Sequence, residues 1–338
     1  MRALGNDVLI YGVTWLGDAI MSMPAIEAAR ARSPKARFTL LARPDLAPLW
    51  RLQPALAAVD VLESGGGTWQ AGRRLRGRGF SCCFILPNSF RSAWIPFLAG
   101  IPVRRGFRGH WRSLLLTEIA VPAGGSAPLH QAAEYFSVFG LEAGRVAPPR
   151  LDIPDSLHDA ARTMLGERGP GRWMVLLPGA ARGPAKRWPP ERFAEIGRRV
   201  RDSTGLGMAV LGSEQEQTIC AEVADGIGNG AVSLAGQTSL PLLAAVLAAG
   251  RIVLANDSGG MHLATAVGTP VVAVFGLTDP RTTGPLGETC RVVTAAGAVA
   301  SRAIPRDSAR ARAALDAVGV DDVLEAVHSL LEATREPA

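Results

Sequence analysis

The sequence predicts an α/β protein made of two doubly wound domains, and three observations lead to this prediction. Short apolar or β-branched segments alternate with longer helical patterns along nearly the whole chain. The apolar segments contain few polar positions, which is typical of parallel strands covered on both faces by helices. At 338 residues, the chain is long enough for two domains of about 100–200 residues each.

The first half of the chain predicts five strands and three helices. The strands are expected at residues 7–13, 36–42, 58–62, 81–87 and 102–106. The helices are expected at residues 18–32, 68–78 and 89–99. Residues 144–154 (GRVAPPRLDIP) are rich in Gly, Arg and Pro, which is typical of a linker. We therefore expect an N-terminal domain at residues 1–150 and a C-terminal domain at residues 151–338.

The second half repeats the pattern of the first. Strands are expected at residues 173–178, 207–211, 231–234, 251–255 and 271–275. Helices are expected at residues 190–203, 214–225, 240–249, 259–267 and 320–333. Ligands of doubly wound sheets bind at the carboxyl ends of the strands. We therefore expect a central cleft between the two domains, with the carboxyl ends of the strands of both domains pointing toward it.

Composition excludes several classes of protein. Apolar residues make up 48% and charged residues 20%, which argues against disordered, collagen-like and disulfide-scaffold proteins. The four cysteines form neither a CxxC pair nor a Cys/His cluster, which favours a reducing compartment and argues against structural zinc. The longest apolar stretches, residues 93–103 and 240–250, are about half of the ~20 residues that a membrane span needs. With no recognisable secretory signal either, we expect a cytoplasmic protein.

The chain is basic, with 36 Lys and Arg against 30 Asp and Glu, a formal net charge of +6. Base composition explains much of this excess, since only two of the cations are lysines. A local cluster can instead attract an anionic partner, and such a cluster comprises Arg104, Arg105, Arg108, His110 and Arg112. No helix-turn-helix or aromatic platform accompanies it, so nucleic acid is not expected.

The first candidate site is the segment TWLGD, which follows the first expected strand. Asp18 lies at the first strand-to-helix turn, where doubly wound sheets bind ligands, and Gly17 eases the turn. The alternative is that Asp18 caps the helix.

The second candidate site is the loop after residue 177, PGAARGPAKRWP. It does not satisfy the P-loop pattern, because Lys186 is neither preceded by Gly nor followed by Ser or Thr. Even so, the turn at Gly179, Ala180 and Ala181 offers backbone N–H groups, and Lys186 offers a point charge for phosphate. The alternative for Lys186 is a solvated loop cation.

The third candidate site is NDSGGMH, which ends an apolar strand and begins a helix. The N–H groups of that helix start suit a diphosphate. The alternative is that Asp257 or Ser258 only caps the helix. A hydrolase pairing Ser258 with His262 is disfavoured, because GxSxG is absent and no orienting acid is evident. By itself, His262 is typical of an interior histidine.

The fourth candidate site is the turn Gly212-Ser213-Glu214, where a ribose could bind. Glu214 serves equally well as a first-turn helix residue. The chain contains no Asp-x-Asp pair, which argues against a divalent metal that bridges a sugar diphosphate.

Taken together, these segments resemble the ADP-heptose:lipopolysaccharide heptosyltransferases, in particular the second type (heptosyltransferase II). The resemblance is carried, in chain order, by WLGDAIMSMPAIEAAR, RRGFRGHWR, LPGAARGPAKRWPPERFAEI, LAGQTSLPLLAAVL and NDSGGMHLATAVGTPVVAVFGLTDP, which span residues 15–280.

This resemblance implies a GT-B glycosyltransferase of two Rossmann-like domains, the N-terminal one for the acceptor and the C-terminal one for the ADP-sugar. It implies an inverting, metal-independent transfer of L-glycero-D-manno-heptose from ADP-heptose to inner-core lipopolysaccharide, the second heptose being favoured. Asp18 matches the general base and Lys186 the phosphate-binding lysine. The other matching donor positions are Gly17, Gly179, Ala180, Ala181, Glu214, Thr238, Asp257, Ser258, Gly259, Gly260, Met261 and His262.

The same resemblance places Arg105, Arg108 and Arg112 near the anionic acceptor. It implies a monomer without cofactors whose partners are ADP-heptose and the lipopolysaccharide core. Residues 93–103 and the Arg-rich segment after them suggest peripheral contact with the cytoplasmic face of the inner membrane, the alternative being a buried helix and strand with an arginine-rich rim. Two alternatives for function remain open: a glycosyltransferase with another nucleotide sugar or acceptor, and a non-catalytic sugar-nucleotide-binding protein.

Overall fold

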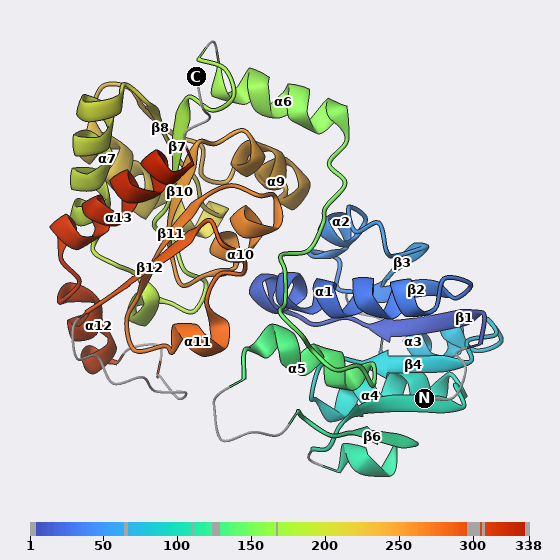
Figure 1. The fold of residues 1–338 in the computed structure, drawn as a ribbon. Helices are drawn as coiled ribbons and strands as arrows, with labels where there is room; N and C mark the ends of the chain where they lie inside the picture. The colour runs from blue at the N-terminus through green and yellow to red at the C-terminus, as the bar shows by residue number, and fades with distance from the viewer. Residues whose placement is uncertain are drawn as a thin grey trace. The chain divides into compact units, whose positions relative to one another are not determined.

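The computed structural model describes residues 5–63, 67–109, 111–123, 129–166, 168–295, 305 and 308–334. Its contacts divide the chain into two compact units, Met1–Asp152 and Ile153–Ala338. Each unit is built around one six-stranded sheet whose neighbouring strands are all parallel (Figure 1). The prediction of two doubly wound parallel sheets is therefore confirmed.

The N-terminal unit has the strand order β3-β2-β1-β4-β5-β6. Its strands are β1 (Asp7–Tyr11), β2 (Arg37–Ala42), β3 (Ala58–Val61), β4 (Cys82–Ile85), β5 (Val103–Phe107) and β6 (Glu118–Ala120). Its helices are α1 (Leu16–Arg32), α2 (Ala47–Trp50), α3 (Thr68–Leu75), α4 (Phe90–Leu98) and α5 (Gln131–Val138), with a 3₁₀ turn, η1 (Arg112–Leu114). The strand order reverses between β1 and β4, so a ligand is expected beyond the carboxyl ends of these two strands.

The C-terminal unit has the strand order β12-β11-β10-β7-β8-β9. Its strands are β7 (Trp173–Leu177), β8 (Gly207–Val210), β9 (Ala231–Ser233), β10 (Ile252–Asn256), β11 (Val271–Phe275) and β12 (Cys290–Thr294). Its helices are α6 (Asp155–Leu165), α7 (Pro190–Thr204), α8 (Gln217–Ile227), α9 (Leu240–Ala248), α10 (Gly259–Ala266), α11 (Pro280–Thr283), α12 (Ala309–Asp316) and α13 (Val320–Ala333), with 3₁₀ turns η2 (Pro184–Lys186) and η3 (Glu214–Glu216). Here the order reverses between β7 and β10, which are hydrogen-bonded neighbours.

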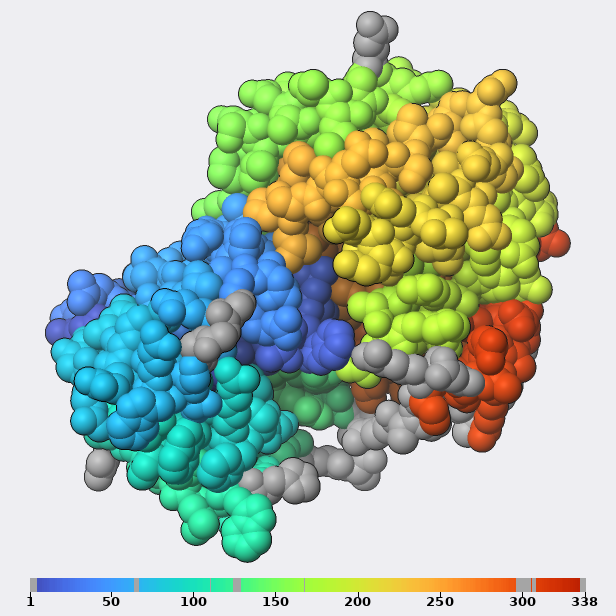
Figure 2. All heavy atoms as spheres, turned by 180° about the vertical axis from the view of Figure 1, so that it is seen from behind, coloured from blue at the N-terminus to red at the C-terminus, as the bar shows by residue number. Residues whose placement is uncertain are grey.

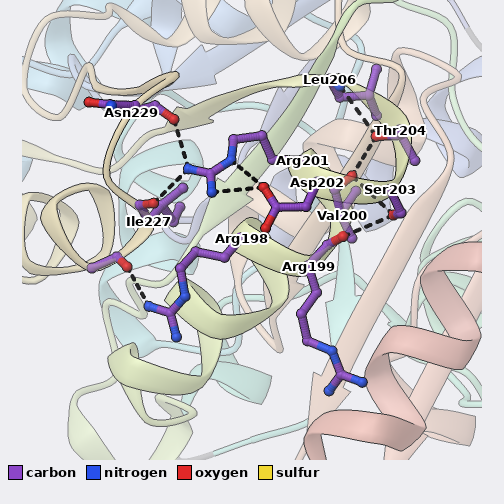
Figure 3. Close-up of polar contacts among 11 residues, drawn as sticks. Arg198, Arg199, Val200, Arg201, Asp202, Ser203, Thr204, Leu206, Ile227 and Asn229 are labelled. Atoms are coloured by element: carbon purple, nitrogen blue, oxygen red, sulfur yellow. Dashed lines mark hydrogen bonds and ion pairs between the residues drawn. The ribbon is translucent and has the colours of Figure 1, made fainter.

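The central strands form because their side chains are apolar on both faces and helices cover both. Every residue of β7, β10 and β11 is buried. Helices α7 and α8 pack together beside this sheet, and polar groups join their ends (Figure 3). Arg201 donates to the carbonyl oxygens of Ile227 and Asn229, both at 2.8 Å, and so ties the end of α7 to the end of α8.

The structure differs from the expected elements mainly at edges and ends. The edge strands β6 and β12 are missed, since β6 has three residues and β12 is half-exposed without a continuous apolar run. Helices α2, α5, α6, α11 and α12 are missed as well. The helix expected to reach residue 78 ends at Leu75, because Gly77 adopts φ +78°, outside the helical region. The Ala/Arg-rich stretch before α13 includes residues 296–304, which lie outside the described residues.

Within the part of the chain that the structure describes, no helix is both long enough and apolar enough to cross a membrane.

Candidate functional site

Asp18 lies in the first turn of α1, directly beyond β1. The helix begins at Leu16 and its N-cap residue is Trp15, so Asp18 is the third helical residue and not the N-cap. The capping alternative for Asp18 is therefore wrong, and its half-buried carboxylate stands at the carboxyl edge of β1 with Gly17 before it.

A second helix holds the Asp18 carboxylate. Helix α5 packs against α1, and Gln131 Nε2 donates to Asp18 Oδ1 at 2.9 Å. The same amide nitrogen lies 3.3 Å from the hydroxyl oxygen of Tyr135. Burial, and then the negative charge of Asp18, raise the pKa of Tyr135 above its ordinary value, so this phenol stays protonated. Gln131 thereby fixes the direction of one carboxylate oxygen.

In the C-terminal unit, the second and third candidate segments meet. Lys186 Nζ lies 2.5 Å from Asp257 Oδ2, and their side chains are only 16% and 9% exposed. Lys186 belongs to η2, after β7, and Asp257 directly follows β10. Because β7 and β10 are the strands at which the order reverses, this ion pair lies where doubly wound sheets bind ligands. The solvated-cation alternative for Lys186 is wrong, since the side chain is largely buried.

Asn256 joins the two segments through the backbone. Its fully buried side chain donates from Nδ2 to the carbonyl oxygen of Pro178 at 2.7 Å and accepts from the N–H of Trp188 at 3.0 Å. The amide thus spans both ends of the loop that carries Gly179, Ala180 and Lys186. Gly179 and Ala180 are buried, and Ala181 is exposed.

The start of α10 contributes backbone N–H groups to the same edge. Ser258 holds the N-cap position with extended angles, but its hydroxyl makes no capping hydrogen bond. Gly259 and Gly260 are half-buried, and a Cβ at Gly260 would lie 2.8 Å from Leu177 Cδ1 at the end of β7. Met261 and His262 are buried, His262 being 3% exposed, as an interior histidine would be.

Glu216 occupies the space beside the glycine turn. A Cβ at Gly179 would overlap the Glu216 carboxyl group, so any other residue at this position would have to displace Glu216. The Glu216 carboxylate accepts from the N–H of Ser213 at 2.8 Å and from its hydroxyl at 2.9 Å, and lies 3.9 Å from Arg187 Nη2. Glu216 therefore connects the loop after β8 to the loop after β7.

Glu214 and Thr238 lie on two loops that touch. Glu214 is exposed at the start of η3, and Thr238 is half-buried just before α9. The N–H of Gly236 donates to the carbonyl oxygen of Gly212 at 3.0 Å. A Cβ at Gly236 would lie 3.2 Å from Glu214 Cα, which shows how closely the loops approach.

The three candidate acceptor arginines differ in exposure. Arg105 is held by the Glu118 carboxylate at 3.0 Å and by the carbonyl oxygen of Val138 at 2.8 Å. Arg112 is fully buried, and its Nη1 donates to the carbonyl oxygen of Pro87 at 2.6 Å. Arg108 is the exposed one of the three. His110, from the same cluster, lies outside the described residues.

Two side chains that position these groups were not singled out from the sequence, Gln131 and Glu216, and Asn256 belonged to the third candidate segment without a role of its own. Glu216 had a local signal, because Ser213 and Glu216 have the S-x-x-E spacing of a capping box. Gln131 had none, since it is 113 residues from Asp18 in the chain. Among the described residues, no group of three or more His, Cys, Asp or Glu is arranged to hold a metal ion.

Comparison with known proteins agrees with this architecture. The fold matches the structure of E. coli ADP-heptose LPS heptosyltransferase II with a TM-score of 0.84 and 27% identity, over 97% of this chain and 99% of that one. Lipopolysaccharide heptosyltransferase 2 of Escherichia coli is 30% identical over 85% of this chain and 87% of its own length. The enzyme of the same name from Salmonella typhimurium is 31% identical with the same coverage.

The two sheets thus form a GT-B glycosyltransferase fold. The profile of glycosyltransferase family 9 (heptosyltransferase) matches residues 68–306. The chain belongs to this family, and it is a glycosyltransferase.

Proposed function

We propose that this protein transfers L-glycero-D-manno-heptose from ADP-heptose to the inner core of lipopolysaccharide, with inversion and without a metal ion, as the second heptose. The observation that carries the proposal is the buried Lys186–Asp257 ion pair, which lies where the strand order reverses between β7 and β10. It occurs in a chain of glycosyltransferase family 9. The two relatives at 30% and 31% identity, both named heptosyltransferase 2, support the choice of the second heptose.

The C-terminal unit holds the donor in this proposal. Lys186 and the N–H groups at the start of α10, from Ser258 to Gly260, bind the diphosphate, with the turn at Gly179–Ala181 beside them. Asp257 holds Lys186 in place until the diphosphate arrives. The loops that carry Glu214 and Thr238 bind the adenosine part of the donor. Met261 and His262 are buried and anchor the start of α10 in the core.

The N-terminal unit supplies the base. The acceptor hydroxyl oxygen attacks the anomeric carbon of the heptose, the bond from that carbon to the β-phosphate oxygen breaks, and ADP leaves with the electron pair. Asp18 takes the hydroxyl proton, and Gln131 keeps its carboxylate oriented. Lys186 stabilises the charge that develops on the leaving phosphate. Arg108 contacts the anionic acceptor, while Arg105 and Arg112 brace the segment that carries it.

We expect the protein to act as a monomer at the cytoplasmic face of the inner membrane. The test is to measure ADP release by the purified protein when it is given ADP-heptose and defined acceptors. Release with a Kdo-plus-one-heptose acceptor, unaffected by a chelator, is the expected result. Release with a bare Kdo acceptor alone would move the enzyme one step earlier. No release with either, despite tight donor binding, would instead favour another acceptor or a binding protein.

The role of Asp18 is tested with Asp18→Asn, which keeps the shape and removes the base. The expected loss in kcat is about 10²–10⁴-fold, with unchanged affinity for ADP. Asp45→Asn is the matched control, because Asp45 is an exposed acid of the same unit that pairs with Arg43 at 3.0 Å. Full activity of Asp18→Asn would reject Asp18 as the base.

A further inference from the structure

Helix α4 leaves an apolar face uncovered. Ala93, Ile95 and Leu98 are buried in the core of the N-terminal unit. On another side of the helix, Phe90 and Phe97 remain 44% and 42% exposed. Their rings stack on Trp94 from either side, with centroids 5.7 and 5.5 Å away. Exposed aromatic rings gathered along one face of a helix are unusual on a protein surface, so this face requires an explanation.

The turn η1 packs against α4 and carries two further exposed apolar side chains. Trp111 and Leu114 are 81% and 79% exposed. Arg104 connects the two elements, since its guanidinium lies over the Phe97 ring at 5.5 Å and its Nε donates to the carbonyl oxygen of Leu115 at 2.7 Å. We call Phe90, Trp94, Phe97, Trp111 and Leu114 the aromatic surface.

Exposed apolar side chains are concentrated in this part of the described chain. Ten large apolar side chains are exposed among the described residues, and six of them lie between positions 90 and 121. Those six are Phe90, Phe97, Trp111, Leu114, Ile119 and Val121. In Figure 2, the cyan and teal atoms of this part of the chain lie at the surface of the N-terminal unit. Single exposed apolar residues need no explanation, but a contiguous group marks an interaction surface.

The chain segment that carries the aromatic surface is rich in arginine, although Arg74, Arg78 and Arg105 pair with acids that lie outside the segment. From residue 64 to residue 117 the sequence contains nine arginines and neither Asp nor Glu. Arg91 and Arg108 of this stretch are exposed, and the Arg104 guanidinium lies over the Phe97 ring. Aromatic rings beside cations are typical of the boundary between lipid headgroups and acyl chains, and cations add attraction to anionic lipids.

We propose that the aromatic surface docks the protein onto an anionic lipid membrane, with its apolar side chains among the acyl chains and Arg91, Arg104 and Arg108 at the headgroups. A single-stranded nucleic acid fits less well. The rings of Phe90, Trp94 and Phe97 already stack on one another, and Leu114 offers no face to a base.

The sequence suggested that residues 93–103 as a whole contact the membrane. The aromatic surface is a different set of residues. Ala93, Ile95 and Ile101 are buried, and β5 lies inside the sheet between β4 and β6. Only one face of α4 and the neighbouring turn face solvent.

The experiment is co-sedimentation of the full chain with phosphatidylcholine vesicles that contain or lack phosphatidylglycerol. Binding to the anionic vesicles alone, weakened by salt, is expected. The double variant Trp111→Asn/Leu114→Ser should reduce that binding at least tenfold, and Arg91→Gln by about fivefold. Asn is chosen because Trp111 has φ +57°, which Asn tolerates. The matched control is Val232→Ser/Val292→Ser, which removes two exposed apolar residues from the other unit and should bind as the parent does.

Absence of binding to anionic vesicles at low salt would overturn the proposal, and so would a double variant that is folded by circular dichroism yet binds normally. Binding to polyuridylate RNA but not to vesicles would reassign the surface to nucleic acid. Because the vesicles contain neither donor nor lipopolysaccharide, this outcome is independent of the transfer assay. A failure of the docking proposal therefore leaves the proposed transfer reaction intact, and the reverse also holds.

Discussion

The ammonium group of Lys186 and the carboxylate of Asp257 lie 2.5 Å apart, although 71 residues separate them in the chain. Both side chains are largely buried, so each charge depends on the other. A phosphate that binds Lys186 therefore has to compete with, or join, an existing negative partner.

Removing one member of this pair should affect both stability and binding. Lys186→Met leaves Asp257 unpaired and should lower the free energy of unfolding by about 3 kcal/mol, with a clear loss of ADP affinity. The double variant Lys186→Met/Asp257→Leu should regain most of the stability but not the affinity. Urea unfolding and calorimetric titration with ADP measure the two effects. Unchanged ADP affinity in Lys186→Met would remove this lysine from the phosphate site.

Gly179→Ala should disturb the glycine turn, because the added Cβ would overlap the Glu216 carboxyl group. Overpacking of this kind costs about 1–3 kcal/mol, and here it also displaces Glu216 from Ser213, so ADP affinity should fall. Gly144→Ala is the control, since a Cβ at that position meets no atom within 4 Å. Equal thermal stability of the two variants would contradict the packing argument.

Asn256→Ala removes the amide that joins Pro178 to Trp188. It leaves a backbone carbonyl and a backbone N–H without this partner, at about 1–3 kcal/mol each. We expect a lower melting temperature and weaker ADP binding, because the loop with Lys186 loses its anchor. Asn229→Ala changes an exposed asparagine and should alter neither the melting temperature nor ADP binding. An Asn256→Ala protein with normal ADP affinity would limit this residue to a purely structural role.

Gln131→Leu should slow transfer. The hydrogen bond from Gln131 orients the Asp18 carboxylate, so its loss should lower kcat while the KM for ADP-heptose stays the same. Affinity for ADP should not change, since Gln131 belongs to the N-terminal unit. Gln70→Leu, in α3, is a control of the same type. An unchanged kcat in Gln131→Leu would argue against this positioning role.

The cysteines should make the protein less stable in alkali. Burial raises the pKa of Cys82 and Cys220 to about 12 and that of Cys290 to about 11. Thiols of the unfolded chain lose their protons at about pH 8.5. Above about pH 9 the unfolded state therefore binds fewer protons than the folded state, and the free energy of unfolding falls.

Urea unfolding at about pH 8 and about pH 10 measures this loss. The double variant Cys82→Ala/Cys220→Ala should reduce the difference in the free energy of unfolding between the two pH values. At neutral pH a thiol reagent should label the native protein slowly and label all four cysteines after unfolding. Rapid labelling of Cys82 in the native protein would contradict the raised pKa.

The sequence by itself determined the alternation of elements and the position of each candidate loop. Apolar strands such as β7, β10 and β11 are recognisable because burial on both faces demands an apolar residue at every position. The placement of Asp18, Lys186 and Asp257 directly after strands follows from the same local pattern. Edge strands such as β6 lack this pattern, because they are paired on one side only and are partly exposed.

Only the tertiary structure decided which side chains meet. The partners Gln131 and Asp18 come from different helices, as Asn256 and Trp188 come from a strand and a distant loop, and no local pattern encodes such distances. The same holds for α4, whose apolar sequence indicates burial while its packing leaves the ring of Phe97 exposed. Periodicity reports on the chain near each residue, whereas contacts between elements depend on how the whole unit packs.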